Sequence, residues 1–174
     1  MTHNVPVWWH VCGIALVTAM FLLNRSTRTS NILVVCITRL PGVFLHELAH
    51  LLTGILFRAE PAGFNLIPRR RGNGRWTLGS VAFRRVTALN AVPIAFAPIG
   101  LVPLAWYIYR YWFHWLPVTL ANMLFLYSAL FLLVCNALPS RQDVRVACNW
   151  KSVLLYGSVV GAAGYVWFRY YAYP

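Results

Sequence analysis

Acidic residues are scarce in this sequence of 174 residues, which contains three Asp and Glu against fifteen Lys and Arg. Charged residues make up only 10% of the chain, whereas 60% of it is hydrophobic and the mean hydropathy is +0.62. Water-soluble domains carry about 25% charged residues. The scarcity of charge therefore excludes an ordinary soluble protein and predicts an integral membrane protein.

Cysteine is also used sparingly and without pattern. None of the four cysteines forms a C-x-x-C pair, and three of them lie within apolar stretches. Neither a disulfide framework nor a cysteine zinc site is indicated. The sequence contains no internal repeat and no low-complexity tract, so we expect a single membrane domain over residues 1–174.

Five apolar stretches approach the length of roughly 20 residues that a helix needs to cross the hydrocarbon layer of a membrane. They cover residues 7–23, 32–57, 88–109, 117–138 and 152–168. Tryptophan and tyrosine gather at their ends, as amphipathic rings do in the headgroup region. The first stretch has no basic residue before it and no Ala-x-Ala site after it, which favours a retained helix over a signal peptide. The expected fold class is an all-α polytopic membrane protein with five transmembrane helices.

Basic residues are concentrated in two of the loops between these stretches. Ten of them follow the second and fourth stretches, against four in the opposite loops. The positive-inside rule then places the N-terminus and both basic loops in the cytoplasm and the C-terminus outside. The net charge of +12 is explained by this pattern without nucleic acid as a partner. We expect a multi-pass protein of the bacterial inner (plasma) membrane, with the lipid bilayer as its surroundings.

The only long polar interval covers residues 58–87. Within it "GFNLIP" and "RWTLGSVAF" flank "RRRGNG", so two strand-like runs surround an Asn-Gly turn signal. This pattern predicts a small β-hairpin on the cytoplasmic face. The alternative is an Arg-rich tether that lies on anionic lipid headgroups.

Two histidines and a glutamate interrupt the second apolar stretch. His46, Glu47 and His50 form the motif H-E-x-x-H, which a chain of this composition contains by chance about 0.002 times. Histidines four residues apart share one helix face, while Glu47 lies about 100° around from His46. The spacing predicts one zinc ion held by His46 and His50, with Glu47 positioned to take a proton from a water molecule. Ionisable groups at membrane depth are costly and normally mark a functional site.

Catalytic zinc usually has three protein ligands, so a third one is needed. Asp143 follows the fourth apolar stretch, which ends on the same side of the membrane as the H-E-x-x-H motif under the charge topology. Asp143 is therefore expected at the depth of the two histidines. Glu60 is the next acidic candidate.

The segments "FLHELAHLLTG" and "NALPSRQD" together resemble the site-2 protease family of intramembrane zinc metalloproteases, in its small single-domain branch. The resemblance covers residues 32–146, a core of three helices. It differs from the usual motif because Val144 replaces a glycine after the aspartate and the spacing from the asparagine is one residue shorter. It implies the following roles: zinc ligands His46, His50 and Asp143, general base Glu47, and Asn136 as a polar contact for the substrate or the oxyanion.

The implied function is zinc-dependent endopeptidase activity on a transmembrane or membrane-adjacent segment of a protein substrate, which the hairpin would hold in extended form. The alternative is a non-proteolytic membrane protein that binds a metal or haem through His46 and His50 and acts as a scaffold. Histidines four apart on one helix cannot occupy opposite axial positions of a haem, and a haem would not need Glu47. Both facts favour the protease.

Overall fold

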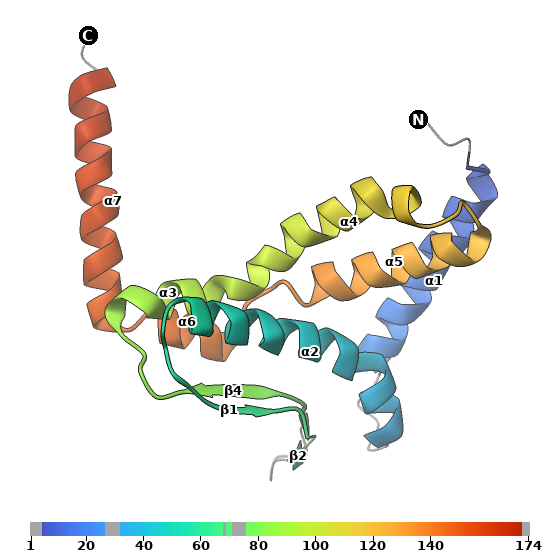
Figure 1. The fold of residues 1–174 in the computed structure, drawn as a ribbon, viewed down its shortest axis with the longest axis horizontal. Coiled ribbons are helices and arrows are strands. Elements are labelled where there is room, and N and C mark those ends of the chain that lie inside the picture. Colours follow the sequence, from blue (N-terminus) through green and yellow to red (C-terminus); the bar gives the residue numbers. More distant parts are fainter. Residues whose placement is uncertain (1–4, 27–31, 68, 71–75, 172–174) are drawn as a thin grey trace.

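The computed structural model describes residues 5–26, 32–67, 69–70 and 76–171 and is mostly helical (Figure 1). The expectation of a mostly helical chain is therefore confirmed. The helices are α1 (Val7–Ser26), α2 (Ile32–Leu56), α3 (Ala88–Phe96), α4 (Leu101–Trp115), α5 (Leu120–Cys135), α6 (Arg141–Ala147) and α7 (Trp150–Tyr171), and a 3₁₀ turn, η1 (Ala97–Gly100), joins α3 to α4.

A small antiparallel hairpin follows α2, as the sequence predicts for residues 58–87. Strand β1 (Pro61–Asn65) pairs with β4 (Ser80–Phe83), and the short strands β2 (Arg69–Arg70) and β3 (Trp76–Thr77) pair beyond them. The expected Asn-Gly turn lies outside the described residues. The hairpin runs alongside α2 (Figure 1), and the ring of Phe83 packs directly on Gly54, where a Cβ atom would lie only 2.1 Å away.

The helix expected over residues 88–109 is divided by η1 and extends to Trp115. Pro98 lies at the start of this turn and is fully buried. Because proline has no N–H group, it cannot donate to the carbonyl four residues earlier, and the α-helical hydrogen-bond ladder is interrupted. That carbonyl belongs to Ile94.

The stretch expected as a helix over residues 117–138 also differs in the structure. Helix α5 ends at Cys135, and the short helix α6, which hydropathy did not indicate, begins at Arg141 after an irregular turn that contains Pro139. This turn redirects the chain so that α6 packs against α3. Asp143 therefore lies on a separate helix with its own N-terminal cap.

The buried core lies between α4 and α5, where α2 packs against them. Leu101, Ala105, Leu133 and Ala137 form a buried cluster, and Leu45 of α2 packs against it. Apolar side chains of α4 and α5 thus support the part of α2 that carries the H-E-x-x-H motif. Helix α1 packs along α5 at the outer side of this core (Figure 1).

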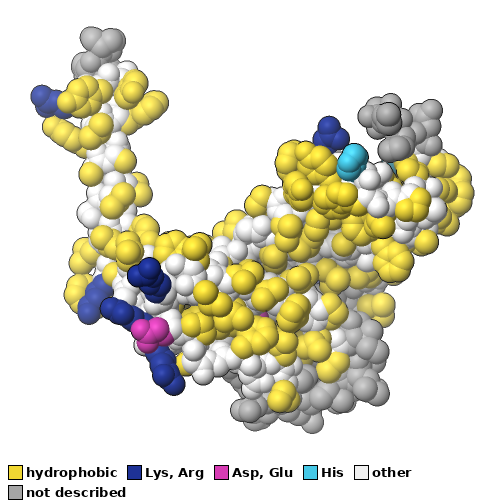
Figure 2. All heavy atoms as spheres, in the orientation of Figure 1, with side chains coloured by type: hydrophobic (Ala, Val, Ile, Leu, Met, Phe, Trp, Pro, Cys, Tyr) yellow, Lys and Arg dark blue, Asp and Glu magenta, His cyan; other side chains and the backbone are white. Residues whose placement is uncertain are grey.

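By length and composition, two helical segments of the described chain could cross a membrane, Val7–Arg25 and Ala88–Trp115. Leu120–Cys135 is an apolar helix of shorter length. Large apolar side chains are exposed on α1, α4 and α7 (Figure 2). Helix α7 extends away from the other helices (Figure 1). Its first turns are attached to α3 by two hydrogen bonds: the Ser152 hydroxyl donates to the Ala88 carbonyl, and the Tyr156 hydroxyl donates to the Leu89 carbonyl.

Candidate metal centre

Helix α2 presents His46 and His50 on one face, one turn apart. The Nδ1 atom of His46 lies 2.8 Å from the carbonyl oxygen of Asn136, and Nδ1 of His50 lies 2.7 Å from that of Ile94. Each Nδ1 therefore donates its hydrogen to a backbone carbonyl, which leaves the Nε2 lone pair free to bind a metal ion. The two Nε2 atoms are 3.2 Å apart.

Both carbonyls are available because helices end beside them. The Ile94 carbonyl accepts the Ala97 N–H but nothing from Pro98, four residues after it, which has no N–H to donate, and Asn136 is the C-terminal cap of α5. The breaks at η1 and at the end of α5 thus supply the two acceptors that fix the orientation of the imidazole rings. Outer contacts of this kind set the tautomer of metal-binding histidines.

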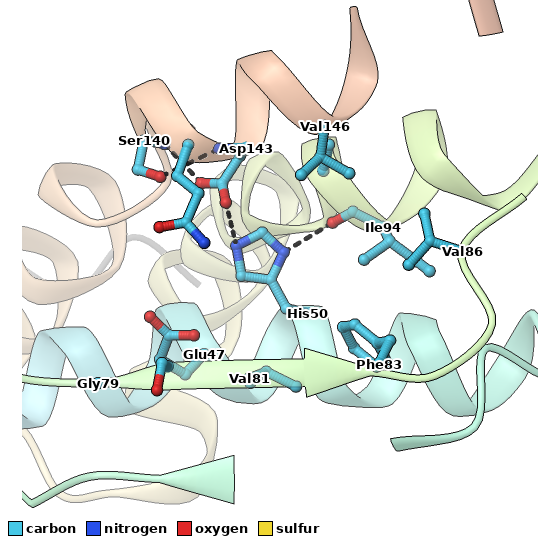
Figure 3. A pocket seen from close by; sticks show the side chains of 13 residues that line it. Glu47, His50, Gly79, Val81, Phe83, Val86, Ile94, Ser140, Asp143 and Val146 are labelled. Atoms are coloured by element: carbon cyan, nitrogen blue, oxygen red, sulfur yellow. Dashed lines mark hydrogen bonds and ion pairs between the residues drawn. The ribbon is translucent and has the colours of Figure 1, made fainter. Parts of the chain in front are cut away.

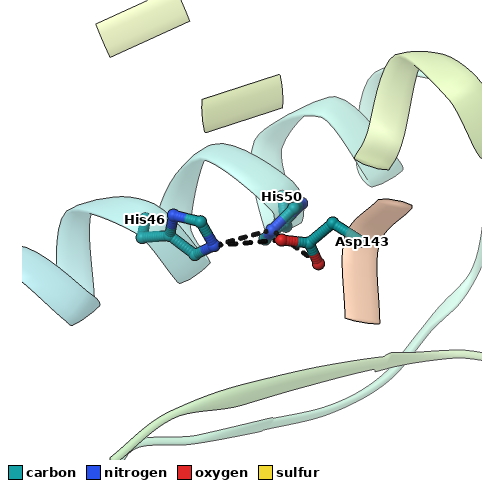
Figure 4. Close-up of side chains that lie close together, drawn as sticks. All are labelled: His46, His50 and Asp143. Atoms are coloured by element: carbon teal, nitrogen blue, oxygen red, sulfur yellow. Dashed lines mark hydrogen bonds and ion pairs between the residues drawn. The ribbon is translucent and has the colours of Figure 1, made fainter. Parts of the chain in front are cut away.

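Asp143 completes a group of three potential ligands. One carboxylate oxygen lies 3.4 Å from Nε2 of His46, and the other lies 3.4 Å from Nε2 of His50 (Figure 4). A tetrahedral ion with bonds of about 2.1 Å separates its ligand atoms by about 3.4 Å. The 3.2 Å between the two Nε2 atoms and the 3.4 Å from each of them to one carboxylate oxygen are close to that value, and one donor atom from each side chain lies within 4.8 Å of the other two, so the three side chains could hold one metal ion.

The carboxylate of Asp143 is oriented by the start of α6. Ser140 caps this helix, because its hydroxyl oxygen accepts the Asp143 N–H at 3.2 Å. In return, the Ser140 N–H donates to Oδ2 of Asp143 at 2.6 Å. This reciprocal pair is a capping box. Burial acts to raise the pKa of Asp143, but its contacts with His46, His50 and Ser140 outweigh it and hold that pKa well below its usual range. Asp143 is therefore an anion at neutral pH, as a carboxylate metal ligand has to be.

Glu47 lies beside this group without belonging to it. Its carboxylate lies near the backbone N–H of Val81 in β4, and its side chain packs on Gly79, where a Cβ atom would lie 2.8 Å from Cγ of Glu47. Figure 3 shows Glu47 next to Gly79, on the strand side of His50. The hairpin therefore holds an acidic side chain near the ligands but outside their coordination group.

A cavity of about 220 Å³ adjoins this group and is lined by two of its members, His50 and Asp143. Residues of α2, β4, α3 and α6 surround it (Figure 3). Its lining includes Glu47, His50 and Asp143, together with the polar residues Ser80, Ser140 and Gln142 and a group of apolar side chains. A substrate that entered this cavity would meet the potential metal ligands and a carboxylate at the same place.

Asn136 contributes to the site through its backbone and not through its amide. The side chain donates to the Leu132 carbonyl at 2.8 Å and faces a second cavity of about 140 Å³ that Arg39 also lines. Gly42 of α2 packs against this amide, and a Cβ atom there would lie 2.1 Å from Nδ2. The structure thus does not bring the Asn136 amide into the cavity that Glu47 lines.

Glu60 lies apart from the two histidines. Its carboxylate is 3.7 Å from the guanidinium of Arg85, and both side chains are more than half exposed. The surface ion pair leaves Asp143 as the acidic residue that joins the histidines within the described chain.

Sequence reasoning missed the roles of Ser140, Ile94 and Pro98. Two signals were present, because Ser140-x-x-Asp143 has the spacing of a capping box and Pro98 follows Ile94 by four residues.

No protein-family model matches the sequence, and comparison with curated proteins and with solved structures finds no match.

Proposed function

We propose that this chain is an intramembrane zinc endopeptidase of the site-2 protease type. The observation that carries the proposal is the convergence of His46 Nε2, His50 Nε2 and the Asp143 carboxylate beside a cavity that Glu47 also lines. Two imidazoles and one carboxylate are a typical donor set of catalytic zinc, which keeps a further position open. Fixed Nδ1–H donors on both rings add the outer contacts that such sites require.

The proposed chemistry is hydrolysis of a peptide bond. When bound, zinc would supply a Lewis acid that activates a water molecule and polarises the substrate carbonyl. Glu47 would accept the proton of the attacking water and deliver it to the leaving amine. The Val81 N–H would hold the carboxylate in position for both steps.

Strand β4 supplies a means of holding the substrate. Ser80, Val81 and Phe83 line the cavity, and β1 pairs with this strand on one side only among the described strands. A peptide that adds to a strand edge is extended, so its scissile bond is no longer shielded by helical hydrogen bonds. Such a substrate would pass the three ligands in the conformation that proteolysis needs.

The features that favour a membrane location also favour a transmembrane or membrane-adjacent protein segment as the substrate. Two helical segments meet the requirements for crossing a bilayer, and exposed apolar side chains cover much of α1, α4 and α7 (Figure 2). Most Lys and Arg side chains visible in Figure 2 gather near the base of α7, close to the hairpin. We propose five crossings, with this basic end in the cytoplasm.

A haem-binding scaffold is disfavoured by the geometry. The two Nε2 atoms lie 3.2 Å apart and converge on one point with the Asp143 carboxylate, whereas haem needs ligands on opposite sides of its iron. A structural metal site would also have no use for a cavity lined by a separate carboxylate. The protease accounts for both features.

Purified protein in detergent should contain about one zinc ion per chain and should cleave peptides that correspond to single transmembrane helices. Elemental analysis and mass spectrometry of the products would measure the two quantities. A chelator should stop cleavage, and added zinc should restore it. Full cleavage by protein whose metal has been removed would contradict the proposal.

Reporter fusions should reveal the membrane topology. An alkaline phosphatase reporter, active only outside the cytoplasm, should be active after His114 and after Tyr171, and inactive after Gln142. A cytoplasmic reporter at the same positions should give the reverse pattern. Inactivity after Tyr171 with activity after His114 would mean that α7 does not cross, and activity after Gln142 would place the three ligands at the outer side.

A further inference from the structure

One wall of the cavity beside His50 is apolar and comes from three separate parts of the chain. Phe83 ends β4, Val86 follows it, Ile94 belongs to α3 and Val146 to α6. Figure 3 shows these four side chains grouped on the side of His50 that faces away from Glu47 and Gly79. The cavity therefore has a polar part at the ligands and an apolar part next to it.

This apolar wall is not closed by packing in the core. Val86 is 46% exposed and Val146 is partly exposed, whereas Ile94 behind them is 4% exposed. Val146 lies one turn after Asp143 on α6, so both side chains project from the same face of that helix. The wall and the ligands are thus held at a fixed separation by a single helical turn.

The size of the cavity suits a large apolar side chain. An apolar cavity of about 150 Å³ can bind benzene, so a cavity of about 220 Å³ accommodates a leucine or phenylalanine side chain and leaves room at its polar end. In an extended peptide, side chains that point to one face recur about every 7 Å. One side chain next to the scissile bond would therefore reach the wall while that bond lies at the ligands.

We propose that Phe83, Val86, Ile94 and Val146 form a side-chain pocket that selects substrates with a large apolar residue, such as leucine or phenylalanine, adjacent to the cleaved bond. This inference rests on the proposed protease function. Its energetic source is the burial of that side chain, which supports a preference of roughly 10- to 100-fold over alanine in kcat/KM. The pocket thus defines the substrate class of the same site.

The test uses two transmembrane peptides that are identical except for leucine or alanine next to the cleaved bond. Wild-type protein should prefer the leucine peptide by roughly 10- to 100-fold in kcat/KM. Val146→Phe and Val86→Phe fill the pocket and should each lower this ratio by about 10-fold or more. Val144→Phe is the matched control, because Val144 lies on the same short helix, is 42% exposed and does not line the cavity.

Peptide binding to the metal-free protein, measured by fluorescence anisotropy, provides a second readout. Selective binding of the leucine peptide that is lost in Val146→Phe supports the pocket, even if wild-type protein cleaves neither peptide and the protease proposal fails. Cleavage of both peptides with equal kcat/KM would overturn the pocket and leave the protease standing. A ratio that changes equally in Val144→Phe and Val146→Phe would also overturn it.

Discussion

Glu47→Gln should lower the turnover of a cleaved peptide by at least ~10²-fold, while the protein keeps the metal content and folded structure of the wild type. Glutamine has nearly the size of glutamate, so it can still pack on Gly79 and keep its amide oxygen near the Val81 N–H. It cannot accept a proton from water. Since Glu47 lies outside the group of metal ligands, metal binding should not depend on its charge. Turnover under saturating substrate and elemental analysis measure the two effects.

Glu60→Gln is the matched control for this experiment. It makes the same chemical change at an exposed ion pair with Arg85, where little stability or activity is at stake. Turnover of Glu60→Gln should stay close to that of the wild type. Equal turnover of Glu47→Gln and wild type would remove the role of Glu47 as general base. Loss of metal from Glu47→Gln would instead identify the carboxylate as a ligand.

Asp143→Ala should weaken zinc binding by more than the 10- to 100-fold typical of outer contacts and should abolish cleavage, because it removes an anionic ligand. Asp143→Asn separates ligation from helix capping. The asparagine oxygen can still accept the Ser140 N–H and preserve the start of α6, but it has no negative charge for the ion. Both variants should therefore lose zinc, and Asp143→Asn should keep more of the stability of the fold. Competition with a fluorescent zinc chelator measures the affinity.

Ser140→Ala provides the comparison for Asp143. It removes the hydroxyl that accepts the Asp143 N–H and should cost about 1 kcal/mol of stability, with a 10- to 100-fold effect on zinc affinity. The order of affinities should be wild type, then Ser140→Ala, then the two Asp143 variants. Wild-type affinity in Asp143→Asn and Asp143→Ala alike would show that the site is completed by another residue.

The main elements of the candidate site could be predicted because they depend on local spacing. The spacing of four positions from His46 to His50 determines that the rings share a helix face, whatever the surrounding fold. Asp143 could be placed near them by combining hydropathy with the distribution of basic residues. The hairpin was signalled by alternating strand-like runs in the only long polar interval.

Other features depend on tertiary contacts or on backbone groups, which residue types do not specify. The direction of the Asn136 side chain is set by its contacts with Gly42 and Leu132, from two different helices. The carbonyls of Ile94 and Asn136 act through atoms that every residue has. Helix α6 spans seven residues, which is too short for hydrophobic periodicity, and its capping box was its only local signal.

If zinc binds as proposed, the Asp143 carboxylate would both hold the ion and cap α6, and zinc supply would then affect the stability of the cavity wall. Oδ2 of Asp143 accepts the Ser140 N–H and also lies 3.4 Å from Nε2 of His46. An ion bound there would therefore be held by the same carboxylate that caps the N-terminus of α6. By mass action, free zinc at 100 times its Kd would add about 2.7 kcal/mol to the stability of the folded form. Because Val146 is carried by α6, the apolar wall would share in that stabilisation. Zinc starvation would then lower the stability of the folded protein as well as stop bond cleavage, and a zinc-replete cell would restore both together.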